Sequence, residues 1–263
     1  MVPIVAALVW FDQPIPWLTL LAAVWGAGAV HEFYGIIKHS KGLSPLTYFG
    51  VLWVVLFIIS HHLSQIPNPY NIDPRYLLLT SAVILPLIIL LWRRGKENAF
   101  AEWAWTVAGI LYIGWLLSYY VELRSLNDGR GWVFLAILST FASDASAYFT
   151  GKALGRHKMA PYVSPKKTWE GAMGGILGAI VASVALSILF RLPLLWWGAI
   201  IVGILISIIG QFGDLVKSLF KRNMGIKDSG NILPGHGGLL DRMDSLAFAG
   251  VLVYYFVVFA RIA

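Results

Sequence analysis

The chain has 263 residues, of which 58% are hydrophobic and only 13% are charged, and its mean hydropathy is +0.73. This composition excludes an ordinary soluble domain and indicates an integral membrane protein. The formal net charge is +7 and cysteine is absent, which excludes disulfides and thiolate metal sites. Because the basic residues accompany membrane-length apolar runs, the expected partners are membrane lipids and nucleotide phosphates, and not nucleic acid.

Apolar runs of about 20 residues, the length that a membrane-spanning helix requires, recur along the whole chain. In order, they occupy residues 17–37, 44–60, 76–92, 101–121, 131–150, 171–190, 194–213 and 239–260. A shorter run at 2–11 is interpreted as a short first helix, because it lacks the basic start and the small-residue cleavage site of a signal peptide. The sequence therefore predicts an all-α, polytopic membrane bundle of about nine transmembrane helices.

Basic residues gather on one side of this predicted bundle. Fifteen of the 20 lysines and arginines fall after the second, fourth, sixth and eighth predicted helices. Because basic residues concentrate on the cytoplasmic side, we expect a multi-pass protein of the cell inner membrane with a cytoplasmic N-terminus and an external C-terminus. Residues 1–121 are expected to form N-terminal helices. Residues 122–263 are expected to form a catalytic region with cytoplasmic loops at 152–168 and 214–244.

Acidic residues within the apolar runs are candidates for function, because an ionisable group at membrane depth needs a partner or a role. Asp144 lies toward the cytoplasmic end of one predicted span. Asp214 ends another, and Lys217, Ser218 and Lys221 follow at spacings that place them on the same helix face. These side chains fit a cluster of phosphate and metal. The simpler alternatives are a structural ion pair at Asp144 and a solvated helix end at Asp214.

A polar stretch precedes the span at 171–190. Proline at position 165 disfavours helix at Ser164, and Lys166, Lys167 and Thr168 then lead into the new helix. Backbone amides, hydroxyls and ammonium groups can all face an anion in such an arrangement. Anchoring of the chain by positive charge, combined with helix capping, explains the same residues equally well.

A glycine-rich turn at 235–238 is followed by Asp241 and Asp244, three residues apart at the start of the last predicted helix. Glycines allow close backbone approach and leave amide groups available to phosphate oxygens. Converging aspartates and lysines are what Mg²⁺ requires when it is held by a few carboxylates and by substrate phosphates. The chain has no Cys or His cluster that favours zinc. Helix capping by the two acidic residues is the alternative.

The segment from residue 218 to residue 244 resembles the C-terminal signature of phosphatidate cytidylyltransferases, also called CDP-diacylglycerol synthases. The positions that carry the resemblance are Ser218, Lys221, Arg222, Lys227, Asp228, Gly230, Pro234, His236, Gly237, Gly238, Asp241, Arg242 and Asp244. Stretches at 144–151 and 164–171 resemble two further blocks of the family, although Ala145 and Ser146 replace its usual hydroxyl residue and glycine. Glu32, Phe33 and Tyr34 resemble its early Glu-Phe-Tyr element, and we expect Glu32 to be a structural residue.

The resemblance implies a reaction of phospholipid biosynthesis in which CTP and phosphatidic acid yield CDP-diacylglycerol and pyrophosphate. The lipid phosphate would attack the α-phosphorus of CTP in line, with metal assistance. The residues expected to hold Mg²⁺, in a site for two cations of which the second is undefined, are Asp144, Asp214, Asp241 and Asp244. Asp214, Asp241 and Lys221 are expected to be catalytic. The residues expected to bind substrate are Ser164, Lys166, Lys167, Thr168, Ser218, Arg222, Lys227, His236, Gly237, Gly238 and Arg242.

Two other classes of protein compete with this interpretation. An ion-coupled transporter would use Asp144 and Asp214 as an ion path, but its charges should lie near the midplane of broken helices, often in repeats. The charges here crowd the predicted cytoplasmic boundary, and the sequence shows no internal repeat. Another membrane phosphotransferase with a lipid or polyprenol substrate is harder to separate on chemistry alone. A homodimer, the acyl-chain preference and the choice between CTP and dCTP stay open.

Overall fold

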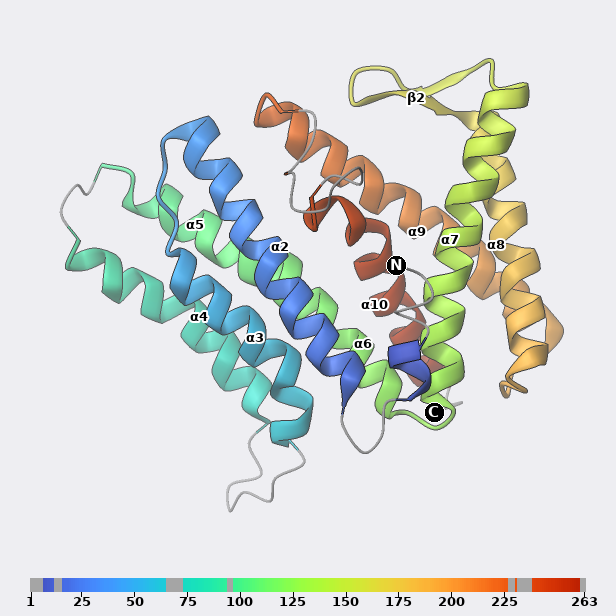
Figure 1. The fold of residues 1–263 in the computed structure, drawn as a ribbon, viewed down its shortest axis with the longest axis horizontal. Coiled ribbons are helices and arrows are strands. Elements are labelled where there is room, and N and C mark those ends of the chain that lie inside the picture. The colour runs from blue at the N-terminus through green and yellow to red at the C-terminus, as the bar shows by residue number, and fades with distance from the viewer. Residues whose placement is uncertain are drawn as a thin grey trace. The chain divides into compact units, whose positions relative to one another are not determined.

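The structure is a computed structural model that describes residues 7–11, 16–64, 73–93, 97–226, 230 and 238–260. This part of the chain is built from helices and one small sheet (Figure 1). The helices are α2 (Trp17–Lys41), α3 (Thr47–Ser64), α4 (Pro74–Leu91), α5 (Ala99–Gly109), α6 (Leu116–Ser125), α7 (Gly129–Leu154), α8 (Trp169–Leu189), α9 (Trp196–Asn223) and α10 (Asp244–Phe259). The strands β1 (Lys158–Ala160) and β2 (Ser164–Thr168) form the sheet, a π-helical turn (Ile110–Trp115) joins α5 to α6, and a 3₁₀ turn (Leu240–Arg242) precedes α10.

Six of the described helices are long and apolar enough to cross a membrane, counting Ala99–Ser125 as one. Two shorter apolar helices lie at Thr47–Ser60 and Asp244–Phe259. The predicted helical membrane protein is therefore confirmed, but the count of nine spans is not. The 16 residues of α10 extend about 24 Å at 1.5 Å per residue, less than the about 30 Å of a bilayer core. Of the run at 2–11, residues 7–10 are helical, and residues 2–6 lie outside the described part.

The chain divides into two compact units. Unit 1 comprises Met1–Trp10, Glu122–Asn223 and Arg242–Ala263, and unit 2 comprises Phe11–Val121 and Met224–Asp241. The segment Met224–Asp241, which carries much of the glycine-rich signature, thus groups with helices from the first half of the chain. The signature at 218–244 is therefore divided between the two units after residue 223 and again after residue 241.

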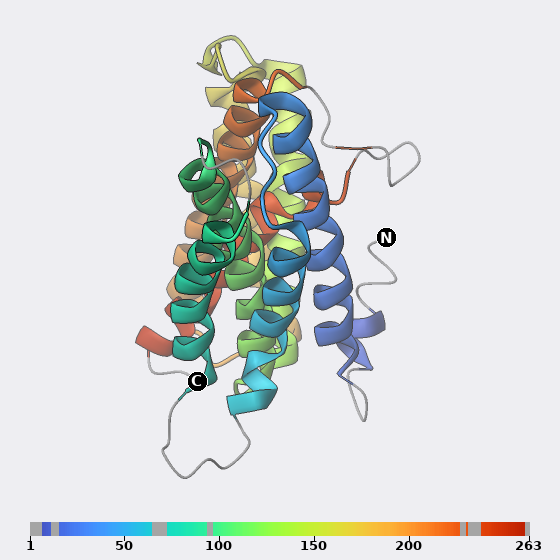
Figure 2. The ribbon, with the colours of Figure 1, turned by 90° about the vertical axis from the view of Figure 1, so that its left-hand side faces the viewer.

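Unit 2 is a group of apolar helices in which α3 packs on α2 and α4, and α5 packs on α2, α3 and α4. Figure 2 shows these helices side by side. The buried cluster consists of Phe57, Ala82 and Ile110, with Phe49, Trp53, Leu78, Leu79 and Trp115 packed against it. Tyr34 is enclosed between Gly50 and Gly109, where any side chain would overlap its ring, and its hydroxyl donates to the Thr106 carbonyl at 2.6 Å. These contacts explain why a tyrosine follows Glu32 and Phe33.

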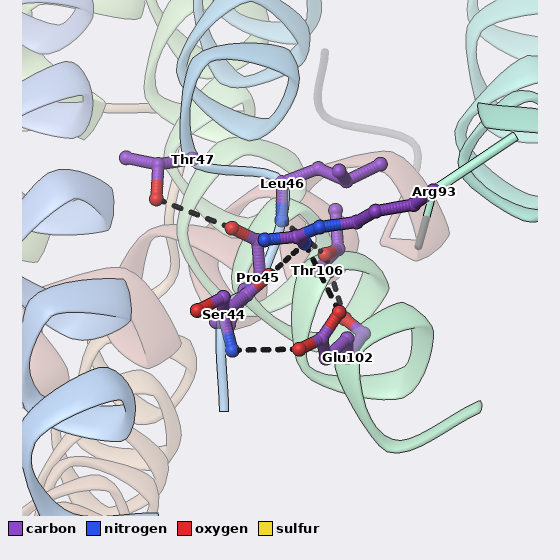
Figure 3. Close-up of polar contacts among 7 residues, drawn as sticks. All are labelled: Ser44, Pro45, Leu46, Thr47, Arg93, Glu102 and Thr106. Atoms are coloured by element: carbon purple, nitrogen blue, oxygen red, sulfur yellow. Dashed lines mark hydrogen bonds and ion pairs between the residues drawn. The ribbon is translucent and has the colours of Figure 1, made fainter. Parts of the chain in front are cut away.

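A polar clasp of Arg93, Glu102 and Ser44 ties three parts of unit 2 together (Figure 3). The Arg93 guanidinium donates to the Ser44 carbonyl at 2.8 Å and to one Glu102 carboxylate oxygen at 3.0 Å. The other Glu102 oxygen accepts the Ser44 amide at 3.0 Å, and the Leu46 amide donates to the Thr106 hydroxyl at 2.9 Å. Because the backbone between α2 and α3 finds its hydrogen-bond partners here, the clasp fixes that connection.

Unit 1 contains α7, α8, α9 and α10, in which α7 packs on α8 and α10, and α9 packs on α8 and α10. The antiparallel hairpin of β1 and β2 joins α7 to α8, with Lys158 opposite Thr168 and Ala160 opposite Ser164. The sequence predicted a polar loop at 152–168 and missed the strands, because they are short and lack alternating apolar residues. Thr168 ends the hairpin and caps α8, since its hydroxyl accepts the Gly171 amide at 3.2 Å.

Candidate active site

Five charged side chains from four elements of unit 1 converge, and they are called the Asp-Lys cluster below. Its members are Asp144 of α7, Lys167 of β2, Asp214 and Lys217 of α9, and Asp244 of α10. The Lys217 ammonium bridges Asp214 at 3.1 Å and Asp244 at 2.6 Å. The Lys167 ammonium lies 2.8 Å from the second Asp214 oxygen. Segments separated by up to a hundred residues thus meet in one group of charges.

Close packing of α9 on α10 brings Asp214 and Asp244 together. A side chain at Gly213 would lie only 2.8 Å from the Asp244 carbonyl oxygen, so glycine is required for this approach. The Asp244 side chain is 4% exposed and that of Lys217 12%, whereas Asp214 is 33% exposed. The cluster therefore contains a buried carboxylate, that of Asp244, and an accessible one, that of Asp214.

Asp144 faces this cluster from α7. Its carboxylate accepts the Ser245 hydroxyl at 3.5 Å, and the charges of the four other cluster members act on it. Within the described residues, no lysine, arginine or histidine lies at ion-pair distance from Asp144. This arrangement argues against the alternative of a structural ion pair. Asp144 is not enclosed by the described protein, so a ligand can reach it.

The hairpin places Lys167 in the cluster, whereas the neighbouring Lys166 lies outside it. Lys167 is half-buried and also donates to the Gln211 carbonyl at 3.2 Å, whereas Lys166 is exposed. Successive residues of a strand point to opposite faces, which separates the two lysines. Arg222 of α9 donates to the Val163 carbonyl at 3.4 Å and so also contacts the hairpin.

The simpler structural interpretations of the polar residues, as ion pairs and helix caps, hold in part. The predicted Asp-to-Lys pair on α9 exists as Asp214 with Lys217, but Lys167 and Asp244 join it, so it is more than a solvated helix end. Asp244 occupies the first turn of α10, where a negative charge is favourable, yet the N-cap residue is Met243 and no side-chain hydrogen bond caps the helix. Thr168 does cap α8, as the capping alternative proposed.

Other predicted site residues are not part of the Asp-Lys cluster as described. Asp241 belongs to unit 2, where its carboxylate accepts the Gly238 amide at 3.4 Å. Ser218 and Lys221 continue α9 beyond Lys217, and Ser164 begins β2. Arg242 is the last residue of the 3₁₀ turn. The residues that lie outside the described part are Lys227, His236 and Gly237.

Sequence reasoning placed Lys217 on the face of Asp214, in a possible cluster of phosphate and metal, but did not include it among the catalytic or substrate-binding residues. It missed Gln211 and Ser245 altogether. The only signal for Lys217 was its position three residues after Asp214, which also fits an ordinary helix pair. Gln211 joins the site through contacts between helices, since its amide donates to the Ser207 hydroxyl at 2.9 Å and to the Ala172 carbonyl at 3.3 Å. No local pattern reveals such contacts.

The carboxylates suit a cation that shares its shell with a substrate phosphate. Among the described residues, no three His, Cys, Asp or Glu side chains are grouped closely enough to hold a metal ion alone. Mg²⁺, however, is usually held by one or two carboxylates plus phosphate oxygens and water. The three carboxylates and two ammonium groups of the cluster have a formal charge of −1. Hard oxygen ligands with an excess negative charge fit Mg²⁺, which stays a prediction.

Fold and site together define a helical membrane protein with a charge cluster suited to phosphate chemistry. The sequence model of the Cytidylyltransferase family matches residues 1–260, so the chain belongs to this family. A phosphatidate cytidylyltransferase of Bacillus subtilis (strain 168) is 38% identical over 242 residues, which cover 90% of this chain and 87% of the relative. The chloroplastic phosphatidate cytidylyltransferase 4 of Arabidopsis thaliana is 39% identical over 211 residues, covering 71% of this chain and 53% of that protein. The resemblance seen in the sequence is thereby confirmed.

Proposed function

We propose that this protein is a phosphatidate cytidylyltransferase, which converts CTP and phosphatidic acid into CDP-diacylglycerol and pyrophosphate. The Asp-Lys cluster carries the proposal, because it brings positive and negative groups together in a helical membrane protein. Such a site suits a reaction between a lipid phosphate and a nucleotide triphosphate. Membership in the Cytidylyltransferase family and relatives that bear this enzyme's name support it.

In the proposed reaction an oxygen of the lipid phosphate attacks the α-phosphorus of CTP. A new phosphorus–oxygen bond forms, the bond between the α- and β-phosphates breaks, and pyrophosphate leaves with the electron pair. The protein provides no nucleophile, so positioning and charge stabilisation account for catalysis. Lys167 and Lys217 would exchange their carboxylate partners for phosphate oxygens, since an ammonium group has three donors and rotates freely.

This exchange releases carboxylate oxygens for cations. Asp144, Asp214 and Asp244 would hold Mg²⁺ when it is bound. From the sequence, we also retain Asp241 as a proposed metal ligand, and we propose two cations in all. The metal would neutralise phosphate charge and stabilise the leaving pyrophosphate. A cluster with a formal charge of −1 repels a triphosphate on its own, which is the physical reason to expect a divalent cation.

Further basic groups would bind the remaining phosphate oxygens. Arg222 already contacts the hairpin, and Lys166 lies exposed beside Lys167. Lys221 stands one turn beyond Lys217 on α9, and we assign it the catalytic stabilisation of the leaving phosphate. Because CTP is a cytoplasmic solute and basic loops favour the cytoplasm, we propose an inner-membrane protein whose site faces the cytoplasm.

The direct test supplies purified protein in detergent with CTP, phosphatidic acid and Mg²⁺ and measures CDP-diacylglycerol. Product is expected only when all three are present, and replacement of CTP by ATP serves as the control. Folded protein that forms no CDP-diacylglycerol would refute the proposal. Ion flux in liposomes without nucleotide turnover would favour the transporter instead, whereas turnover of another lipid phosphate would favour a different phosphotransferase.

A further inference from the structure

Glu32 of α2 is a buried carboxylate in unit 2 that contacts the signature segment. Glu32 is only 8% exposed, and it lies on a helix that is otherwise largely apolar. One carboxylate oxygen accepts the backbone amide of Leu240 at 2.8 Å, across 208 positions of sequence. A buried carboxylate in an apolar helix is costly unless it has a specific partner. The Leu240 amide is such a partner.

The same helix face holds the segment at two further points. The other Glu32 oxygen lies where a side chain at Gly230 would stand, so the Gly230 backbone packs directly against this carboxylate. The Trp25 indole donates to the Leu239 carbonyl at 3.2 Å, and the Leu239 side chain covers Gly28. Trp25, Gly28 and Glu32 recur at spacings of three and four, which is one face of a helix. This face therefore contacts residues on both sides of positions 231–237.

The contact to Leu240 bears directly on Asp241. Leu240 begins the 3₁₀ turn that contains Asp241, and the Asp241 carboxylate in turn accepts the Gly238 amide at 3.4 Å. A hydrogen bond to a charged acceptor is stronger than one between neutral groups. Glu32 thus fixes the backbone at the residue before a proposed metal ligand.

We infer that Glu32 is a positioning residue, which holds the backbone of the signature segment so that Asp241 is presented in one orientation. The expected loss of turnover rests on the proposed function, whereas the expected effect on the backbone at 238–243 does not. Glu32 acts through Leu240 and does not touch substrate in this account. The early Glu-Phe-Tyr element is thereby linked to the C-terminal signature by a hydrogen bond instead of by packing alone.

Three variants separate this role from general stabilisation. Glu32→Ala leaves the buried Leu240 amide without its acceptor, whereas Glu32→Gln keeps an oxygen with the same reach. Gly230→Ala adds a methyl group where the Glu32 carboxylate lies and displaces it from Leu240. Glu122→Gln is the matched control, because Glu122 is a buried glutamate, 6% exposed, on α6 instead of α2.

The first measurement is hydrogen exchange of peptides that cover residues 238–243, in the purified full chain without substrate. Loss of a buried hydrogen bond should speed exchange there about tenfold in Glu32→Ala. Gly230→Ala should show a similar increase, and Glu32→Gln and Glu122→Gln should stay within about twofold of wild type. The second measurement is turnover, where a misplaced group lowers kcat of Glu32→Ala by about 100-fold and Glu32→Gln restores most of it.

Unchanged exchange at 238–243 in folded Glu32→Ala would overturn the inference. If that variant does not fold, Gly230→Ala decides, and wild-type exchange in it would overturn the inference equally. A loss of kcat in Glu122→Gln as large as in Glu32→Ala would reduce Glu32 to a general structural residue. If the wild type forms no CDP-diacylglycerol, the proposed function fails, while the exchange measurements still judge the role of Glu32.

Discussion

The Asp-Lys cluster of unit 1 and the Arg93 clasp of unit 2 both contain ion pairs, but the partners of their charged groups differ. In the clasp, Arg93 and Glu102 pair with each other and also bind the carbonyl and the amide of Ser44. In the cluster, Lys217 bridges Asp214 and Asp244, and Lys167 pairs with Asp214 and also donates to the Gln211 carbonyl. Charges that satisfy backbone groups stabilise the fold. Charges that chiefly satisfy one another can exchange partners with a ligand.

Removal of the accessible carboxylate should have the largest effect on activity. Asp214→Asn keeps the size of the side chain but removes its charge, so we expect turnover to fall by at least about 100-fold while the protein still folds and inserts. Asp241→Asn should behave alike. The check is to measure CDP-diacylglycerol formation by each variant, after size-exclusion chromatography has shown that the variant is folded. Near-wild-type turnover with both aspartates replaced would show that the metal site is wrongly placed.

Removal of the bridging lysine should affect stability as well as activity. Lys217→Ala leaves the buried Asp244 carboxylate without its ion-pair partner, which costs about 3 kcal/mol of stability for a buried pair. Thermal unfolding in detergent measures this loss. Added Mg²⁺ should recover part of it in the variant, because a cation can replace the ammonium charge. A wild-type unfolding temperature would contradict the bridging role of Lys217.

Replacement of Lys167 should weaken binding without abolishing turnover. Lys167→Ala removes one of several basic groups that face phosphate, so the KM for CTP or for phosphatidic acid should rise about tenfold. Lys166→Ala provides the comparison and should raise the KM less, since Lys166, which is also proposed to bind phosphate, is the exposed neighbour outside the cluster. An equal effect of the two substitutions would mean that Lys167 contributes only general positive charge.

The clasp should respond in the opposite way from the cluster. Glu102→Gln keeps an oxygen for the Ser44 amide but loses the ion pair with Arg93, which is partly exposed and so contributes at most about 1 kcal/mol. We expect a small drop in unfolding temperature and turnover within about twofold of wild type. A loss of activity comparable to that of Asp214→Asn would remove the distinction between the two groups of charges.

The sequence predicted the membrane helices and the family because hydropathy and local motifs record both directly. Asp144, Asp214 and Asp244 could be selected because charges are rare in apolar runs. The hairpin of β1 and β2 could not be predicted, since its strands are short and polar. The bridge from Lys217 to Asp244 and the contact of Glu32 with Leu240 also escaped prediction, because each depends on packing between segments that are distant in the sequence.

The central claim is that the Asp-Lys cluster binds the nucleotide together with a divalent cation, whereas the clasp does not. Titration of CTP into the purified protein, with and without Mg²⁺, tests this most directly in the wild type, Asp214→Asn and Glu102→Gln. We predict Mg²⁺-dependent CTP binding in the wild type and in Glu102→Gln, and its loss in Asp214→Asn. Unchanged Mg²⁺-dependent binding in folded Asp214→Asn would contradict the claim.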